Sequence, residues 1–283
     1  MTQQTWFITG VSSGFGRHLA EQLLARGDRV VGTVRNPEAA ADLVKSHPDQ
    51  FRAEILDVTD TAALREVVDR TFADLGRVDV VVSNAGYGLF GAGEEYTDDQ
   101  IRHIIDTNLI GSIQLIRAAL PHLRAQGGGR IIQLSSYGGQ VAFPGSSMYH
   151  ATKWGIEGFA EAIAPEVAPF GIGITIVEPG GARTEFRYGS AQVAAPMAAY
   201  DATSAHDFRA RLDPHAPATG DPARMATAII DSAGLEPAPL RLLLGTDAYE
   251  RTHQVLQGRL AALEAQKDLA ASTDVRTGHR GPG

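Results

Sequence analysis

Cysteine is absent from the 283 residues of the chain. Its absence excludes disulfide bonds, a thiolate nucleophile and a Cys-ligated zinc of the kind that polarises the substrate in some alcohol dehydrogenases. The nine histidines form no HExxH pair or other short ligand spacing, so we predict that the protein has no metal site.

Long apolar runs and runs of basic residues are missing as well. No stretch approaches the roughly 18 apolar residues of a membrane span. The chain enters an apolar strand pattern at Trp6, which is too early for a cleavable leader. The formal net charge of −8 repels polyanions. We therefore expect a cytoplasmic protein that binds neither nucleic acid nor a membrane and acts on a small molecule.

The pattern of apolar residues indicates an α/β fold. Short apolar runs, typical of buried strands, alternate with longer stretches of helical period. The predicted strands are 6–9, 30–34, 52–56, 78–83, 130–135, 172–177 and 240–244. The predicted helices lie near 17–25, 37–46, 61–75, 98–126, 148–168 and 222–233. This alternation predicts one doubly wound, seven-stranded parallel sheet with helices on both faces, whose ligands bind beyond the carboxyl ends of the strands.

Two segments break the alternation. Residues 184–221 are rich in Ala, Gly, Pro and Ser and have only weak helical period, and we interpret them as a substrate lid. Residues 267–283 are polar and predict a mobile tail, with an intersubunit arm as the alternative. No linker divides the rest, so residues 1–266 are predicted to form a single domain.

A glycine-rich turn follows the first predicted strand. Its glycines permit positive φ and a close approach of the backbone to a ligand, and the helix that begins next offers free N–H groups to an anion. The turn therefore predicts a cradle for a diphosphate, the alternative being a tight turn in which Ser12 or Ser13 caps the helix. The residues of the turn are Gly10, Val11, Ser12, Ser13, Gly14, Phe15 and Gly16.

The spacing T-G-x-x-x-G-x-G resembles the single-domain branch of the short-chain dehydrogenase/reductase family, and further motifs of that family recur in order over about residues 5–185. The resemblance implies a Rossmann-type fold that binds a nicotinamide cofactor. Beyond the glycine turn, the cofactor-binding residues it implies are Asp57, Val58, Asn84, Ala85, Gly86, Tyr149, Lys153, Pro179, Gly180 and Thr184. For Asp57 a second role is open, because either Asp57 or Thr59 is placed to cap the next helix.

The end of the second predicted strand favours NADP(H) over NAD(H). Enzymes that bind NAD commonly place a carboxylate there to accept hydrogen bonds from the adenosine ribose. Here Val34 occupies the position, and Arg35 follows it with a planar cation suited to a ribose 2′-phosphate. The alternative is a solvated loop arginine, which leaves NAD(H) possible. We interpret Arg17 as an ordinary residue of the first helical turn.

Tyr149 and Lys153 lie four residues apart on a predicted helix and so project from one face. A free phenol has a pKa of about 10. We expect the ammonium of Lys153 to lower that pKa, so that Tyr149 serves as general base in alcohol oxidation and general acid in carbonyl reduction. By resemblance, Lys153 also holds the nicotinamide ribose. The alternative for such a pair is a packing ring beside a solvated stem.

Ser136 and Asn108 complete the catalytic set that the resemblance implies. Ser136 would orient the substrate oxygen, and strand alternation turns the neighbouring Ser135 the other way. Asn108 would anchor a water that relays protons to solvent, the alternatives being a surface amide or a local kink. Ser136, Tyr149 and Phe186 are the predicted substrate contacts.

Large apolar side chains near these motifs suggest a hydrophobic substrate. They either wall a pocket or pack the core or an interface, and we weigh the two equally. The side chains are Phe143, Met148, Phe186, Tyr188, Met197, Tyr200 and Phe208.

The sequence as a whole predicts an NADP(H)-preferring ketoreductase or alcohol dehydrogenase and, by resemblance, a homotetramer or homodimer. The alternatives are a non-catalytic NADP-binding regulatory protein and an NAD-dependent alcohol dehydrogenase. A sugar-nucleotide epimerase would share the Tyr-x-x-x-Lys pair, but its usual glycine spacing is absent.

Overall fold

The computed structural model describes residues 3–184, 189–210 and 219–275. Seven strands form one sheet in the order β3-β2-β1-β4-β6-β7-β9, and every neighbouring pair is parallel. The strands are β1 (Thr5–Thr9), β2 (Arg29–Val34), β3 (Phe51–Ile55), β4 (Val80–Ser83), β6 (Gly129–Leu134), β7 (Ile172–Pro179) and β9 (Arg241–Leu244). The predicted seven-stranded, doubly wound parallel sheet is confirmed.

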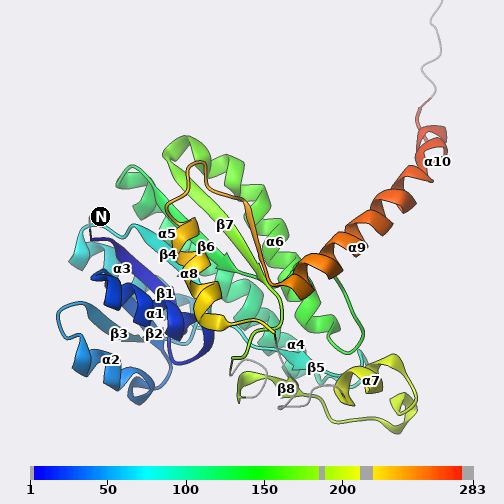
Figure 1. The fold of residues 1–283 in the computed structure, drawn as a ribbon, viewed down its shortest axis with the longest axis horizontal. Coiled ribbons are helices and arrows are strands. Elements are labelled where there is room, and N and C mark those ends of the chain that lie inside the picture. Colours follow the sequence, from blue (N-terminus) through cyan, green and yellow to red (C-terminus); the bar gives the residue numbers. More distant parts are fainter. Residues whose placement is uncertain (1–2, 185–188, 211–218, 276–283) are drawn as a thin grey trace, which may run out of the picture.

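Helices cover both faces of this sheet (Figure 1). One face packs on a buried cluster shared by α3 (Thr61–Leu75), α5 (Gly111–Ala125) and α6 (Ser147–Val167). The other face packs on a cluster shared by α1 (Gly14–Arg26), α2 (Ala41–Ser46) and α8 (Pro222–Ser232). Because the strands are buried on both sides, they read as continuous apolar runs in the sequence, and this is why the sequence located them.

The long helical pattern at 98–126 is interrupted in the structure. It consists of α4 (Asp98–Ile105), a π-helical turn (Asp106–Ile110) and α5, and Asn108 lies in the π turn. A capping box at Thr97 and Gln100 begins α4. The helical period therefore changes locally at Asn108, while the kink considered for this residue stays a prediction.

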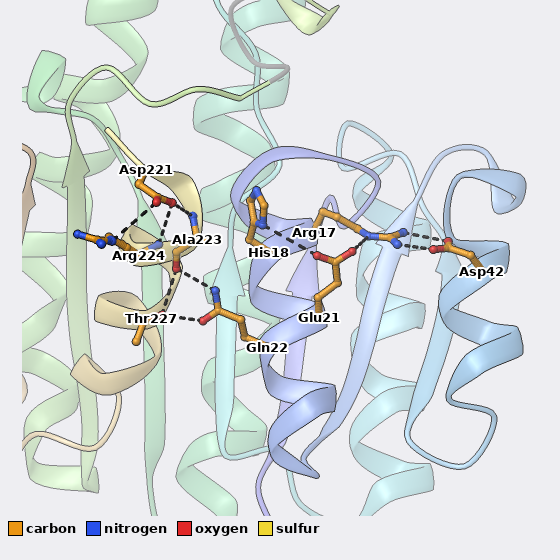
Figure 2. Close-up of polar contacts among 9 residues, drawn as sticks. All are labelled: Arg17, His18, Glu21, Gln22, Asp42, Asp221, Ala223, Arg224 and Thr227. Atoms are coloured by element: carbon orange, nitrogen blue, oxygen red, sulfur yellow. Dashed lines mark hydrogen bonds and ion pairs between the residues drawn. The ribbon is translucent and has the colours of Figure 1, made fainter. Parts of the chain in front are cut away.

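Two helices at one side of the sheet are joined by polar contacts as well as by their apolar faces (Figure 2). Gln22 of α1 donates from Nε2 to the carbonyl oxygen of Ala223 in α8 at 2.8 Å and accepts from the Thr227 hydroxyl at 2.9 Å. Asp221 caps α8 by accepting from the N–H groups of Ala223 and Arg224. These contacts tie the second half of α1 to the first turns of α8.

Figure 2 also shows Arg17 at the start of α1, where it bonds Glu21 and Asp42. Both nitrogen edges of its guanidinium are occupied by these carboxylates. The interpretation of Arg17 as a helix residue with no part in phosphate binding agrees with this arrangement.

The carboxyl-terminal part of the chain contains helices that the sequence patterns did not predict. α9 (Thr246–Glu264) leaves the sheet edge and projects away from the body, followed by α10 (Lys267–Ser272) (Figure 1). Nearly all α9 side chains are exposed, Leu256, Leu260 and Leu263 among them. The division into a domain at 1–266 and a tail stays a prediction.

A small second sheet, formed by β5 (Leu89–Phe90) and β8 (Gln192–Val193), lies outside the main one. It joins the segment after β4 to the described part of the predicted lid, which also contains α7 (Ser204–Ala210). Within the described part of the chain, no helix combines the length and apolarity needed to cross a bilayer.

A cluster of charges ties α6 to the sheet. Arg241 of β9 bonds Glu157 and Glu161 of α6, each at 2.6 Å, and also Glu178 of β7. The side chains of Glu157 and Glu178 are only 3% and 1% exposed, and Arg241 is the cation that forms an ion pair with both. Burial raises the pKa of Glu157, against the opposing effects of its hydrogen bonds to Ser135 and Arg241.

Replacing Arg241 by Met should therefore lower the free energy of unfolding by about 3–5 kcal/mol at pH 7, because two buried carboxylates lose their cation. The loss should shrink as the pH falls toward 5, since protonation of Glu157 removes the uncompensated charge. Urea unfolding at both pH values measures it. Arg102→Met is the matched control: this guanidinium also bonds two carboxylates but is 67% exposed, and the change should stay below about 0.5 kcal/mol. Equal losses in the two variants would contradict the expectation.

Candidate active site

A cavity of about 620 Å³ lies along the carboxyl ends of the central strands. It brings together most of the residues that the sequence singled out. Those that line it are Gly10, Ser12, Ser13, Gly14, Phe15, Arg35, Asp57, Val58, Asn84, Ala85, Gly86, Ser136, Tyr149, Lys153, Pro179, Gly180 and Thr184. Gly16 and Asn108 do not line it, and Phe186 lies outside the described residues.

The glycine turn forms one wall of the cavity. Gly10 and Gly14 have φ values of +75° and +58°, which other residues rarely adopt. A Cβ on Gly16 would lie 2.1 Å from the carbonyl oxygen of Gly10, so the turn closes only around a glycine. Ser13 is the N-cap of α1, but its side chain makes no capping bond. The first turn of α1 thus presents N–H groups that no side chain caps, which suits a diphosphate.

Asn84 holds the turn in place. Its Nδ2 donates to the carbonyl oxygens of Thr9 and Gly10 at 2.8 and 2.9 Å. The N–H groups of Asn84 and Ala85 in turn donate to the Thr9 hydroxyl. The end of β4 is in this way fixed to the end of β1, so Asn84 shapes the cavity wall through the backbone of its neighbour.

The far end of the cavity, beyond β2 and β3, carries one cation and one carboxylate. Arg35 is exposed, and its guanidinium makes no hydrogen bond or ion pair with the residues that the structure describes. Burial opposes ionisation of Asp57, but hydrogen bonds from Thr59 and the charge of Arg35 outweigh it and hold the pKa of Asp57 below its usual value. The capping role considered for Asp57 or Thr59 was wrong, because Asp60 caps α3.

Ser136, Tyr149 and Lys153 meet at the other end of the cavity, where β6 ends beside α6. The Ser136 hydroxyl hydrogen-bonds Tyr149. Lys153 donates from Nζ to the carbonyl oxygen of Leu134 at 2.9 Å and lies 5.7 Å from the centre of the Tyr149 ring. Ser135 also belongs to the cavity lining, but its hydroxyl donates to Glu157 at 2.5 Å. Of the two serines, only Ser136 hydrogen-bonds Tyr149.

The electrostatics of this group differ from the expectation. Burial raises the pKa of Tyr149 to about 12, and the hydrogen bond with Ser136 only partly offsets that effect. Burial also lowers the pKa of Lys153 to about 8, against the opposing charge of Glu157. The sequence predicted a lowered pKa for Tyr149, and this was wrong because loss of solvation raises it and the charge of Glu157 acts in the same direction. The phenol is protonated at neutral pH.

Asn108 is buried and acts on the loop after β4. Its Oδ1 accepts from the N–H of Tyr87 at 3.0 Å, and its Nδ2 donates to the Tyr87 carbonyl oxygen at 2.8 Å. A longer contact reaches the hydroxyl of Thr152 on α6. The surface-amide alternative is excluded by the 1% exposure of Asn108. Its predicted role in a water relay stays a prediction.

Aromatic rings form part of the cavity wall. Phe208 of α7 lies 5.1 Å from Phe143 and 5.8 Å from Phe90, measured between ring centroids. All three rings line the cavity, whereas Met148, Met197 and Tyr200, which we weighed as wall residues, do not. Tyr188 lies outside the described residues.

The position of Phe208 depends on a buried ion pair. The fully buried side chain of Glu95 accepts from Arg209 at 2.9 and 3.0 Å and from the backbone of Ala92 and Met197. Arg209 belongs to α7 and follows Phe208 directly. The described part of the predicted lid is therefore anchored to the segment after β5.

Glu157 is a residue of the site that sequence reasoning missed. It lies one helical turn beyond Lys153 on the same face of α6, and the i, i+4 spacing was the available signal. Glu157 does not itself line the cavity; Phe90 and Asp247 do, and they carried no motif. Among the described residues, no three His, Asp or Glu side chains gather as metal ligands.

Comparisons with known proteins agree with this geometry. A family model described as short chain dehydrogenase matches residues 4–193. Oxidoreductase BOA17 of Botryotinia fuckeliana is 37% identical over 269 residues, which cover 95% of this chain and 98% of that protein. A short-chain dehydrogenase from Streptomyces avermitilis superposes with a TM-score of 0.91 at 41% identity, covering 97% of this chain and 100% of that one. The structure of ElxO with NADP bound gives a TM-score of 0.71 at 25% identity and covers 86% and 97%.

The glycine turn yields a direct test of the cradle. Gly16→Ala places a methyl group against the Gly10 carbonyl, so the turn must open and NADPH affinity should fall by about 100-fold or more, an effect of roughly 3 kcal/mol. Fluorescence titration with NADPH measures it. Gly158→Ala is the control, since a Cβ there meets nothing within 4 Å on a helix. Unchanged affinity in Gly16→Ala would remove the turn from the binding site.

Proposed function

The chain belongs to the short-chain dehydrogenase family and is an oxidoreductase, and from the geometry of its cavity we propose that it prefers NADP(H) and interconverts a ketone or aldehyde with an alcohol on a hydrophobic small molecule. The observation that carries the proposal is the meeting of Ser136, Tyr149 and Lys153 at one end of a cavity whose middle is the glycine turn.

The residues divide the work of a carbonyl reduction. A bound nicotinamide supplies or accepts the hydride. Ser136 donates a hydrogen bond that orients the substrate oxygen, and Tyr149 gives that oxygen a proton as negative charge develops on it. The raised pKa of Tyr149, about 12, keeps the phenol in the protonated form that this direction requires. Lys153 places a cation beside the ring, held at the Leu134 carbonyl.

In the direction of alcohol oxidation, burial of Tyr149 opposes the proton transfer that the reaction requires. Tyr149 must then lose its proton, and burial disfavours the phenolate. A cation beside the ring offsets that cost, and Lys153 is the cation that α6 provides. Reduction is accordingly the direction that the protonation state of the described residues supports best.

Preference for NADP(H) is supported by charge at the adenosine end. Arg35 extends into solvent beside the cavity without a bonded carboxylate among the described residues, and Val34 supplies no acceptor for ribose hydroxyls. A 2′-phosphate satisfies an unpaired guanidinium, whereas a ribose hydroxyl is a poor partner for it. ElxO, whose fold this chain shares, was solved with NADP bound.

A hydrophobic substrate is supported by the rings of Phe90, Phe143 and Phe208 in the cavity wall. Flat apolar faces bind carbonyl compounds of aromatic or aliphatic kind and leave orientation to a few polar groups. Association into a homotetramer or homodimer stays a prediction.

Removing the phenolic hydroxyl tests the mechanism. Tyr149→Phe should lower NADPH-dependent ketone turnover by about 10²- to 10⁴-fold, because the proton donor is lost. NADPH affinity should remain within about threefold, since the ring stays in place. Steady-state rates and fluorescence titration give the two quantities. Tyr249→Phe, on the exposed surface of α9, is the control. Full turnover in Tyr149→Phe would contradict this role and indicate another proton donor, whereas a parent chain that binds NADPH but turns over no ketone would favour the regulatory alternative.

Replacing Arg35 by Ala tests the cofactor preference. NADPH affinity should fall about 10- to 100-fold, the worth of one or two charge-assisted hydrogen bonds. NADH affinity should stay nearly constant, so the preference ratio should fall by the same factor. Arg29→Ala removes an exposed arginine at the opposite end of β2 and serves as the charge-matched control. A ratio that does not change would remove Arg35 from cofactor recognition, and a parent chain that binds NADH more tightly than NADPH would favour the NAD-dependent alternative.

A further inference from the structure

Asp247 is a carboxylate in the cavity wall that the proposed chemistry does not use. It lies in the first turn of α9, directly after β9, and lines the cavity. It also lies beyond residues 4–193, the part of the chain that the family model matches.

The structure makes room for this side chain. Its Oδ2 accepts from the N–H of Gly181 at 2.8 Å, which ties α9 to the turn after β7. A Cβ on Gly180 would lie 2.2 Å from Oδ1, and a Cβ on Gly245 would lie 2.7 Å from it. Two glycines are thus needed for the carboxylate to reach its position.

No cation compensates Asp247 among the residues that the structure describes. Its Oδ1 is buried without a hydrogen-bond partner there. The carboxylates of Glu95 and Glu157 differ, because Glu95 is paired with Arg209, and Glu157 with Arg241. A carboxylate oxygen that is buried without a hydrogen bond or a cation is costly, and the positive end of α9 offsets only part of that cost. The missing charge is therefore expected from a ligand.

The order of the strands indicates which half of the cavity would hold the positive charge of the ligand. β7 and β9, whose ends carry Gly181 and Asp247, lie beyond β6 on the side away from β2. Ser136, Tyr149 and Lys153 lie at the end of β6 on the same side, and Arg35 lies at the end of β2 on the other. A dinucleotide whose adenosine end binds at Arg35 has its nicotinamide end in the half that contains Asp247. The oxidised nicotinamide is a cation, and the reduced one is neutral.

We propose that the carboxylate of Asp247 stabilises the oxidised form of the bound cofactor over the reduced form. The inference rests on the proposed function. When a hydride passes with its two electrons to a carbonyl carbon, and the Tyr149 proton passes to the oxygen, the nicotinamide gains one positive charge beside Asp247. The carboxylate therefore shifts the equilibrium between bound species toward alcohol and oxidised cofactor.

The test compares the affinities of NADP⁺ and NADPH for the full chain, each titrated without substrate. Asp247→Asn removes the charge but keeps an oxygen that accepts from Gly181. It should weaken NADP⁺ binding about tenfold and leave NADPH binding within about twofold. Asp221→Asn is the matched control, because it makes the same change of net charge at the cap of α8, outside the cavity, where Asn also caps.

The outcomes separate the possible roles. Equal changes for both cofactor forms, or none, would overturn the inference and leave Asp247 as a structural clamp, with the proposed function intact. If the parent chain binds neither form, the proposed function fails and the inference with it. Should Asp247→Asn not fold, as judged by thermal unfolding, Asp247→Ser must give the same selective loss of NADP⁺ affinity. A selective loss in Asp221→Asn would also contradict the assignment, since that charge lies outside the cavity.

Discussion

A buried carboxylate, that of Glu157, joins the elements from which the catalytic end of the cavity is built. It accepts from Ser135 at the end of β6 and from Arg241 of β9, and it lies one helical turn from Lys153 on α6. Low local dielectric strengthens each of these interactions and makes the loss of any partner costly. The distance between the end of β6 and the face of α6 is consequently fixed by charge as well as by apolar packing, and the relation of Ser136 to Tyr149 follows from it.

Burial sets the charge state of the catalytic group. It raises the pKa of Tyr149 to about 12 and lowers that of Lys153 to about 8, so the phenol stays protonated while the ammonium keeps its charge less firmly than a lysine in water. Asp247 and Arg35 lie in opposite halves of the cavity. Neither side chain forms an ion pair with a residue that the structure describes. On the proposed function, the oxidised dinucleotide with its 2′-phosphate at one end and its cationic ring at the other would complement both charges.

The sequence predicted what local patterns determine. Buried parallel strands are apolar throughout, and turns with positive φ require glycine, so the sheet and the Gly10–Gly16 turn were identified without structural information. Long-range contacts were not predictable in this way. Glu95 meets Arg209 across 114 positions, and Asp247 meets Gly181 across 66. The pKa of Tyr149 was misjudged for a related reason, because the depth at which a side chain is buried depends on the whole fold. α9 escaped prediction because it buries almost no side chain against the sheet.

Because of the ion pair between Glu95 and Arg209, the shape of the apolar cavity wall does not depend only on the residues that line the cavity. Phe208 faces the cavity, yet its place there is set by its neighbour Arg209 and by a carboxylate outside the cavity lining. Natural variation at the anchor can therefore reshape the apolar wall while every residue that touches a substrate stays the same. Substitutions at Glu95 or Arg209 can therefore change which molecules fit the cavity while Ser136, Tyr149 and Lys153 stay the same.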